Sequence, residues 1–340
     1  MGVSHALTEA GLSHRVLERN RIGETWRTQR WDSFRMNVPN VQLVMPGDHY
    51  DGPEPEGFVT RDEFVELLED YAERNRLPVD EHTPVTELTR SEEDGTYLLN
   101  TPRGGLQARN VVIASGNLNL PRRPAVAAAL PPHLRQLDSS EYRNSAELPA
   151  GAVLVVGSAQ SGGQIAEDLV RAGRAVYLAT CRVGRMARRY RGRDISLWLV
   201  QSGLFDVPRK EFTEPSGHIT ARPLLGAVHT ISLQSLSTQG VVLLGRFMAV
   251  YGSRLTFADD VEANLRFADE SSANGKRHID AYIARHGLDA PPAVEDPAEV
   301  VSPRLPAPPI LSLDPTEDGI STVIWCTGFQ GDYSWIRLRV

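Results

Sequence analysis

Cysteine is scarce in this sequence, and long apolar runs are absent. The 340 residues include only Cys181 and Cys326, which lie far apart and form no Cys-x-x-Cys pair, and the nine histidines show no metal-ligand spacing. The dithiol of a thiol–disulfide reductase is therefore missing. No apolar stretch reaches the roughly 20 residues of a membrane-spanning helix, and no signal peptide is recognisable. We expect a cytoplasmic protein with no metal centre and no membrane partner.

An excess of positive charge is also absent. The 36 Lys and Arg residues against 43 Asp and Glu give a formal net charge of −7. This balance argues against a nucleic-acid partner. The length and the 41% hydrophobic content allow a large core and predict two domains.

The segment from Val153 to Gly163 combines an apolar run with a glycine turn. Val153–Val156 reads as a buried strand, and the next residues are Gly157, Ser158, Ala159, Gln160, Ser161, Gly162 and Gly163. This strand–turn–helix pattern is the context of a dinucleotide-binding fingerprint, in which amides at the helix start favour a pyrophosphate. Gly157 allows the tight turn and Gly162 allows close helix–strand packing, while Ala159 replaces the usual middle glycine. The alternative interpretation is an ordinary βα turn.

The residues downstream of this turn favour NADP over NAD. An apolar stripe of Ile165, Leu169 and Val170 predicts a helix that stops at Gly173, and a strand follows at 176–178. Thr180 and Arg182 then stand where an NAD site usually has an acid, so a guanidinium is available for a 2′-phosphate. We interpret the arginines that follow as a solvated basic loop, and these are Arg185, Arg188, Arg189, Arg191 and Arg193.

The first residues match the second half of another βαβ unit. A helix is predicted over 3–10 and a strand over 15–17, and Glu18 follows as an acid placed to bind ribose hydroxyls. The alternative is that Glu18 is a surface acid. The first strand and its glycine turn would precede residue 1, so we expect an FAD-type domain that lacks its first strand.

Further elements define the predicted domains. Thr60 and Glu63 form a capping box that starts a helix, and short strands are expected at Val85–Leu88 and 97–99. Residues 111–116 predict a buried strand, 119–124 a linker, 259–286 a helix with a break near 274–275, and 322–325 a buried strand, whereas 291–309 is Pro-rich and irregular. The fold class is therefore α/β with two Rossmann-like domains. An incomplete FAD-binding domain spans 1–120, completed in part by 315–340, and an NADP-binding domain with inserted substrate-region segments spans 121–314. The topology of 195–257 is not predicted.

The order of these motifs resembles the flavin-dependent monooxygenases that use FAD and NADPH. Asn37 matches the asparagine that this family places near the reacting edge of the flavin, and Arg182 matches its 2′-phosphate contact. The resemblance implies further cofactor contacts at Glu18, Arg19, Gly23, Thr25, Trp26, Arg27, Val85, Ala114, Ser115, Gly116, Gly157, Ser158, Ala159, Gln160, Ser161, Gly162, Thr180, Thr327 and Gly328.

Three features depart from the family pattern. The first glycine motif is missing, the family signature around Tyr142 and Arg143 survives in part, and the C-terminal FAD contact would lie beyond Val340. We therefore expect a sequence truncated at both ends that holds FAD weakly. Tyr142 and Arg143 are predicted to anchor the two domains to each other.

The resemblance implies a monooxygenase that inserts one oxygen atom into a small organic substrate through a flavin hydroperoxide, with molecular oxygen as co-substrate. Asn37 would be the catalytic residue; otherwise it is a turn asparagine of the Val38–Pro39 loop. A homodimer is one open assembly state. Two rival functions remain, an NADPH-dependent flavoprotein reductase or oxidase, and a non-catalytic NADP-binding remnant.

Overall fold

The computed structural model describes residues 1–213 and 223–338. We call the parts that correspond to the predicted FAD-binding and NADP-binding domains the first and the second unit. A five-stranded parallel sheet forms the centre of the second unit. The strand order is β12-β9-β8-β16-β7, and every pairing is parallel. The central strand consists of apolar, mostly β-branched residues that are all buried, which suits a strand covered on both faces. The strands are β7 (Arg135–Asp138), β8 (Ala152–Val156), β9 (Val176–Ala179), β12 (Val242–Leu244) and β16 (Ile320–Trp325).

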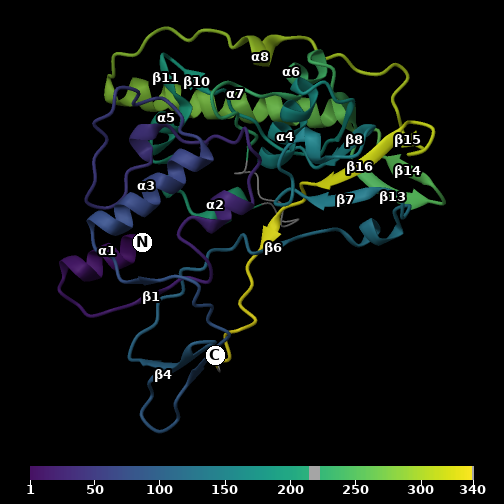
Figure 1. Ribbon diagram of the computed structural model, residues 1–340. Helices are drawn as coiled ribbons and strands as arrows, with labels where there is room; N and C mark the ends of the chain where they lie inside the picture. The colour runs from purple at the N-terminus through teal and green to yellow at the C-terminus, as the bar shows by residue number, and fades with distance from the viewer. Residues whose placement is uncertain (214–222, 339–340) are drawn as a thin grey trace.

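Alternate side chains of β8 contribute to two separate cores. Val153 and Val155 pack with Ile165 of α4, whereas Leu154 and Val156 pack in a cluster on the opposite face. Helices cover the first face: α4 (Gln160–Arg171), α6 (Leu233–Thr238) and α7 (Val261–His286). A small antiparallel sheet covers the second: β13 (Phe247–Tyr251), β14 (Arg254–Phe257) and β15 (Ser312–Leu313). Figure 1 shows these layers around β16 and β7.

Helix α7 is a single helix of 26 residues, so the predicted break near 274–275 is wrong. Gly275 instead permits a close approach, because a Cβ there would lie 2.9 Å from Cε of Met186. Helix α7 is long but polar. No helix in the described ranges is both long and apolar enough to cross a membrane. Packed against α7 are α5 (Ile195–Gln201) and the hairpin of β10 (Arg189–Tyr190) and β11 (Arg193–Asp194).

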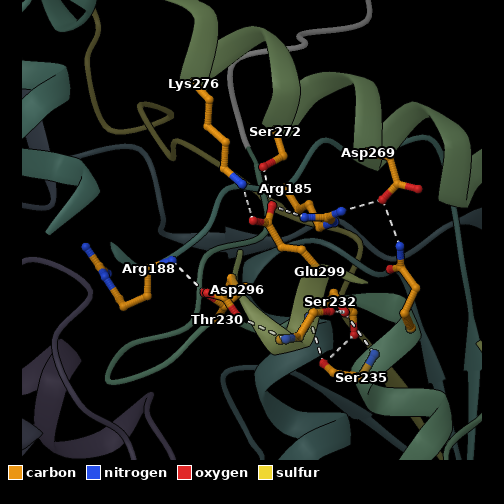
Figure 2. Close-up of polar contacts among 12 residues, drawn as sticks. Arg185, Arg188, Thr230, Ser232, Ser235, Asp269, Ser272, Lys276, Asp296 and Glu299 are labelled. Atoms are coloured by element: carbon orange, nitrogen blue, oxygen red, sulfur yellow. Dashed lines mark hydrogen bonds and ion pairs between the residues drawn. The ribbon is translucent and has the colours of Figure 1, made fainter. Parts of the chain in front are cut away.

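The segment 291–309 is irregular, as predicted, apart from α8 (Pro297–Val300). Glu299 of α8 accepts hydrogen bonds from Ser272 and Lys276 of α7 and pairs with Arg185 (Figure 2). We refer to 291–309 as the strap. The strap therefore lies along α7 and is fastened there by buried charges.

The first unit is built from short elements. Its strands β1 (Val16–Leu17) and β2 (Val79–Asp80) form a two-stranded parallel sheet. The capping box of Thr60 and Glu63 is confirmed at the start of α3. The remaining elements are α1 (Gly2–Glu9), α2 (Glu24–Thr28), α3 (Arg61–Arg74) and the hairpin sheet of β3 (Glu87–Arg90), β4 (Tyr97–Thr101) and β5 (Gly104–Ala108). Short 3₁₀ turns elsewhere occupy Asn40–Gln42, Ala125–Ala129, Ser145–Glu147, Leu204–Asp206 and Arg209–Phe212.

The predicted strand at 111–116 is wrong. These residues have no regular structure, and the side chains of Val112 and Ile113 are 61% and 41% exposed. The first unit has one described parallel pair, β1–β2, and neither of these strands pairs with this segment. A strand needs hydrogen-bonding neighbours, so the apolar pattern alone does not form one here.

Two chain crossings join the units. The predicted linker includes β6 (Leu120–Pro121), which pairs antiparallel with β17 (Phe329–Gln330). The chain after β17 returns to the first unit, where the amide of Leu88 donates to Trp335 O. One part of the predicted domain division is therefore corrected: β16, assigned with 315–340 to the first domain, is a central strand of the second unit, because its apolar residues complete that sheet.

Candidate functional site

The Gly157 turn lies at the point where the strand order of the large sheet reverses, between β8 and β16. Parallel α/β sheets bind nucleotides at the carboxyl ends of the strands at such a point. Gly157 has φ +103°, and a Cβ there would lie 2.6 Å from Cys326 O. A Cβ at Gly162 would lie 1.7 Å from Gly157 O. Both positions therefore require glycine, which leaves the backbone open to a close approach.

The start of α4 provides uncapped amides at this turn. Its N-cap residue, Ala159, makes no side-chain capping hydrogen bond. The first-turn N–H groups of a helix have no intrahelical acceptor and attract an anion. Together with the two required glycines, these amides fit the pyrophosphate of a dinucleotide, and Ser161 lies half-buried beside them.

Two predicted cofactor contacts are directed into the protein instead. The buried Ser158 hydroxyl accepts from the amide of Cys181 at 3.1 Å and so joins the ends of β8 and β9. Thr180 is also buried; its hydroxyl donates to Leu244 O and accepts from Asn264. Both hydroxyls therefore complete internal hydrogen bonds, and a cofactor contact of Ser158 or Thr180 stays a prediction.

Arg182 lies exposed after β9, with its guanidinium 4.4 Å from the ring centroid of Phe267. The interpretation of the following arginines as a solvated loop is wrong for Arg185 and Arg188, which are 3% and 2% exposed. Arg188 pairs with the buried Asp194. Burial lowers the pKa of Arg188, and the Asp194 charge opposes this shift. These two arginines connect elements inside the protein.

Asn37 of the first unit contacts the second unit through two atoms. Its Oδ1 accepts a hydrogen bond from Nε2 of Gln164 in α4 at 2.8 Å. Its backbone oxygen accepts from Nη1 of Arg188 at 3.0 Å. The side chain is half-buried, and among the described residues Nδ2 has no hydrogen-bond acceptor. Asn37 thus presents an amide donor beside the helix of the Gly157 turn.

The predicted anchoring role of Tyr142 and Arg143 is confirmed. The buried Tyr142 hydroxyl donates to Asp168 of α4 at 2.6 Å, and Ser33 of the first unit donates to the same carboxylate. Burial, followed by the Asp168 hydrogen bond, raises the pKa of Tyr142. The carbonyl of Arg143 accepts from the amide of Asp32. These contacts hold the two units together next to Asn37.

The residues predicted to form the FAD ribose site follow directly after β1. Glu18 is half-buried and accepts from the amide of Asn20, and Arg19 is exposed. Gly23 has φ +74° and begins α2, where a Cβ would lie 3.1 Å from Val65. Whether these residues contact a cofactor stays a prediction.

Other predicted flavin contacts are engaged elsewhere or exposed. Trp26 packs edge-on against Phe64, Arg27 pairs with Glu69, and Thr25 is exposed. Val85 precedes β3. The remaining predicted contacts lie exposed around the two crossings: Ala114, Ser115, Gly116, Thr327 and Gly328. The fit to FAD is therefore partial, since none of the described strands pairs with the segment 114–116.

Neither cysteine has the surroundings of a reactive thiol pair. Burial raises the pKa of Cys326, whose amide donates to Val156 O at the base of the turn. Cys181 is half-buried, and its Sγ lies 3.8 Å from the Ser158 hydroxyl. No group of three or more His, Cys, Asp or Glu side chains able to hold a metal occurs in residues 1–213 and 223–338.

The fold and the turn define a dinucleotide-binding α/β protein, and comparison with known proteins agrees. The family of pyridine nucleotide-disulphide oxidoreductases matches residues 1–201, which is more than half of the chain. The chain therefore belongs to this family.

Individual relatives extend the comparison. An uncharacterized CzcO-like oxidoreductase of Geobacillus kaustophilus is 28% identical over 95% of this chain and 75% of its own length. Indole-3-pyruvate monooxygenase YUCCA1 of Oryza sativa subsp. japonica is 28% identical over 51% of this chain and 43% of its own length. A solved flavin-containing monooxygenase from Stenotrophomonas maltophilia superimposes with a TM-score of 0.61 at 17% identity, covering 98% of this chain and 76% of that chain.

These findings confirm the predicted resemblance and the α/β fold class. The predicted cofactors, FAD and NADPH, are confirmed at the level of the family and its structural neighbours. The assignment of individual residues to these cofactors stays a prediction.

Sequence reasoning missed Gln164 and Arg188, the residues that hold Asn37. Gln164 follows Gln160 by four residues, so the spacing along the predicted helix was a signal that both share one face. Arg188 carried no local signal, because its burial depends on Asp194, on Asn37 and on Gly226 O.

Proposed function

We propose that the protein is an NAD(P)H-dependent flavoprotein monooxygenase that transfers one atom of molecular oxygen to a small organic substrate. The observation that carries the proposal is the position of Asn37. A loop of the first unit brings this residue against α4, the helix whose start fits a dinucleotide pyrophosphate. The monooxygenase names of the rice relative and of the Stenotrophomonas structure support the same reaction class.

The residues of this chain would bind and orient the reacting groups. When bound, NADPH and FAD supply the hydride and electron chemistry that activates oxygen. The amides at the start of α4 would receive the pyrophosphate, and the Arg182 guanidinium would pair with the 2′-phosphate. Nδ2 of Asn37 would donate a hydrogen bond where negative charge develops on oxygen.

Replacement of Asn37 tests the proposal. We expect Asn37→Ala to oxidise NADPH at a nearly unchanged rate but to release hydrogen peroxide in place of oxygenated product. Loss of one preorganised donor typically costs on the order of 10²-fold, so the ratio of peroxide to product should rise at least about tenfold. Product is measured by mass spectrometry and peroxide by a coupled peroxidase assay, per NADPH consumed.

Asn40→Ala is the matched control from the same loop. Asn40 is buried; its Nδ2 donates to Glu54 O and its Oδ1 accepts from the Val59 amide. Loss of this side chain should therefore lower the stability of the protein. It should leave the ratio of peroxide to product unchanged. An unchanged ratio in Asn37→Ala as well would make Asn37 a loop residue only.

The rival of an NADPH-dependent reductase or oxidase has the family description in its favour. It predicts peroxide or reduced acceptor, and no oxygenated product, from the unaltered protein. The remnant hypothesis is favoured by the exposed segment 111–116, and it predicts NADPH binding by a colourless protein. Cytoplasmic location and a homodimer remain predictions.

A further inference from the structure

The backbone of Leu225 fixes the orientation of two glutamine side chains on α4. Its amide donates to Oε1 of Gln160 at 3.1 Å, and its carbonyl accepts from Nε2 of Gln160 and, at 3.2 Å, from Nε2 of Gln164. A carbonyl oxygen only accepts hydrogen bonds, so the NH₂ end of Gln164 must face Leu225. The same NH₂ group reaches Asn37.

This orientation determines which atom of Asn37 faces α4. A second donor would repel the NH₂ group of Gln164, so the atom at 2.8 Å must be Oδ1. Arg188 holds the backbone oxygen of Asn37 and, through the same Nη1, Gly226 O. Both oxygens of Asn37 thus accept from side chains, Gln164 and Arg188, that also bond to the neighbouring carbonyls of Leu225 and Gly226, and its NH₂ group points elsewhere.

We propose that Gln164 is a positioning residue that keeps Nδ2 of Asn37, rather than Oδ1, directed at the reacting groups. An unrestrained asparagine amide exchanges its donor and acceptor ends by a half-turn about its last torsion. Because Gln160 and Gln164 lie one turn apart on α4, the helix that begins at the phosphate turn also sets the Asn37 amide. This inference rests on the proposed function, which gives Nδ2 its role.

The first test needs no cofactor. In protein labelled with ¹⁵N-asparagine, the side-chain signal of Asn37 is identified by its loss in Asn37→Asp. We expect Gln164→Met, which keeps the length but removes the donor, to shift that signal. The matched control is Gln136→Met in β7, which removes a donor to Ala127 O and the acceptor of the Trp325 indole N–H; it should leave the signal in place. An unmoved signal in Gln164→Met would overturn the proposal.

The second test uses the holoenzyme. We expect Gln164→Met to raise the ratio of peroxide to product about threefold to tenfold, the loss of roughly one neutral hydrogen bond. In Gln164→Glu the ratio should become pH-dependent, since only the protonated acid can donate to Oδ1 of Asn37. The charged groups near this position are Arg188, bound to Asn37 O, and two carboxylates on the next turn of α4: Asp168, which accepts from Tyr142, and Glu167, which is paired with His229 and Arg171.

The outcomes separate the two hypotheses. Recovery of product in Gln164→Glu as the pH falls, with no such trend in the unaltered protein, supports positioning and is not expected of a merely structural glutamine. In a second outcome, the Asn37 signal shifts in Gln164→Met, but the ratio of peroxide to product is unchanged in both Gln164→Met and Asn37→Ala. This result would overturn the catalytic role of Asn37 and still support the hydrogen bond between Gln164 and Asn37. A ratio that changes in Asn37→Ala but not in either Gln164 variant would overturn positioning alone.

Discussion

Two segments with nearly the same apolar pattern have opposite fates in this protein. Val153–Gly157 reads Val-Leu-Val-Val-Gly, and its first four residues belong to β8, the fully buried centre of a five-stranded sheet. Residues 111–116 read Val-Val-Ile-Ala-Ser-Gly and lie irregular and exposed in the first unit. Both segments have the residues of a buried strand and both end in glycine.

The difference lies in the surroundings. Strands β9 and β16 satisfy the backbone of β8 on both edges, and packed clusters cover its two faces. The first unit has the two-stranded sheet β1–β2, the hairpin sheet β3–β4–β5 and a small core around Tyr71 and Leu77, and none of these described strands pairs with 111–116. Strand propensity is therefore a statement about fit to neighbours, and the neighbours decide whether an apolar run becomes a strand.

Matched truncations sharpen this contrast most strongly. Leu154→Ala should lower the free energy of unfolding by about 2–5 kcal/mol, because it leaves a cavity between the sheet and β14. Ile113→Ala removes a comparable aliphatic side chain from an exposed position and should change stability by less than about 0.5 kcal/mol. Urea denaturation followed by circular dichroism measures both. A loss of similar size in Ile113→Ala would mean that 111–116 packs as a strand in solution.

The parts of the fold that the sequence predicted are those with local causes. The run from β8 through α4 to β9 followed from an apolar strand, two glycines and a helical stripe, and α3 followed from its capping box. The exposed 111–116 and the insertion of β16 into the large sheet depend on which distant strands are present to pair, and no local pattern carries that information.

The candidate site divides in the same way. Gly157 and Gly162 were recognisable because the turn demands glycine at both. The burial of Arg185 and Arg188 was not predictable, since each is neutralised by carboxylates that lie on other elements, and Ser158 and Thr180 were directed inward by partners more than 20 residues away. Polar residues of this kind look like surface residues until the fold supplies their partners.

The strap tests the contrast between buried and exposed charge. Glu299→Gln should lower the free energy of unfolding by roughly 2–3 kcal/mol. Breaking a buried pair usually costs about 3–5 kcal/mol. The loss is smaller here because Asp269 still pairs with Arg185 and Lys276 is partly exposed. Glu69→Gln breaks the exposed pair with Arg27 and should cost less than about 1 kcal/mol. Denaturant unfolding measures both, and equal losses would contradict the comparison.

Acid should release the strap for the same reason. Burial alone would raise the pKa of Glu299, but hydrogen bonds from Lys276 and Ser272 and the Arg185 charge outweigh it and hold the pKa below the ordinary 4.5. A depressed carboxylate pKa contributes stability above the unfolded value and loses it as the pH falls through the folded one. Hydrogen exchange across 291–309 should therefore accelerate as the pH drops below about 4.5 relative to α4, and a pH-independent ratio would argue against this fastening.

Arg182 tests the binding half of the second unit. Arg182→Ala should weaken NADPH binding by about 1–3 kcal/mol, through loss of a charge-assisted phosphate contact, and leave NADH nearly untouched. Arg193 is the matched control, because its guanidinium also lies over an aromatic ring, 4.5 Å from Trp198, away from the turn. Fluorescence titration of both nucleotides measures the effect. Equal weakening of NADPH and NADH in Arg182→Ala would assign Arg182 to packing on Phe267.

The smallest expected effect tests whether local signals alone support the first unit. The Thr60 hydroxyl accepts from the Glu63 amide at 3.2 Å, and the Glu63 carboxylate accepts from the Thr60 amide at 2.7 Å. Thr60→Ala should destabilise α3 by about 1 kcal/mol, as for other N-cap losses, and Thr60→Ser should retain most of the stability. Thr28→Ala removes an exposed hydroxyl that donates to Glu24 O within α2 and should be nearly neutral. Hydrogen bonds from the Thr60 amide and from the Thr60 hydroxyl lower the pKa of Glu63. The bond from the hydroxyl to the Glu63 carboxylate, at 2.9 Å, is absent in Thr60→Ala, and in the unaltered protein it weakens as Glu63 protonates in acid. The free energies of unfolding of Thr60→Ala and of the unaltered protein, measured by denaturant unfolding, should therefore differ less as the pH falls below the ordinary Glu value of 4.5.

One outcome would contradict this prediction. If Thr60→Ala leaves the stability unchanged at pH 7 while Thr28→Ala lowers it, the cap does not limit the stability of α3, and packing of α3 against α2 stabilises the first unit instead.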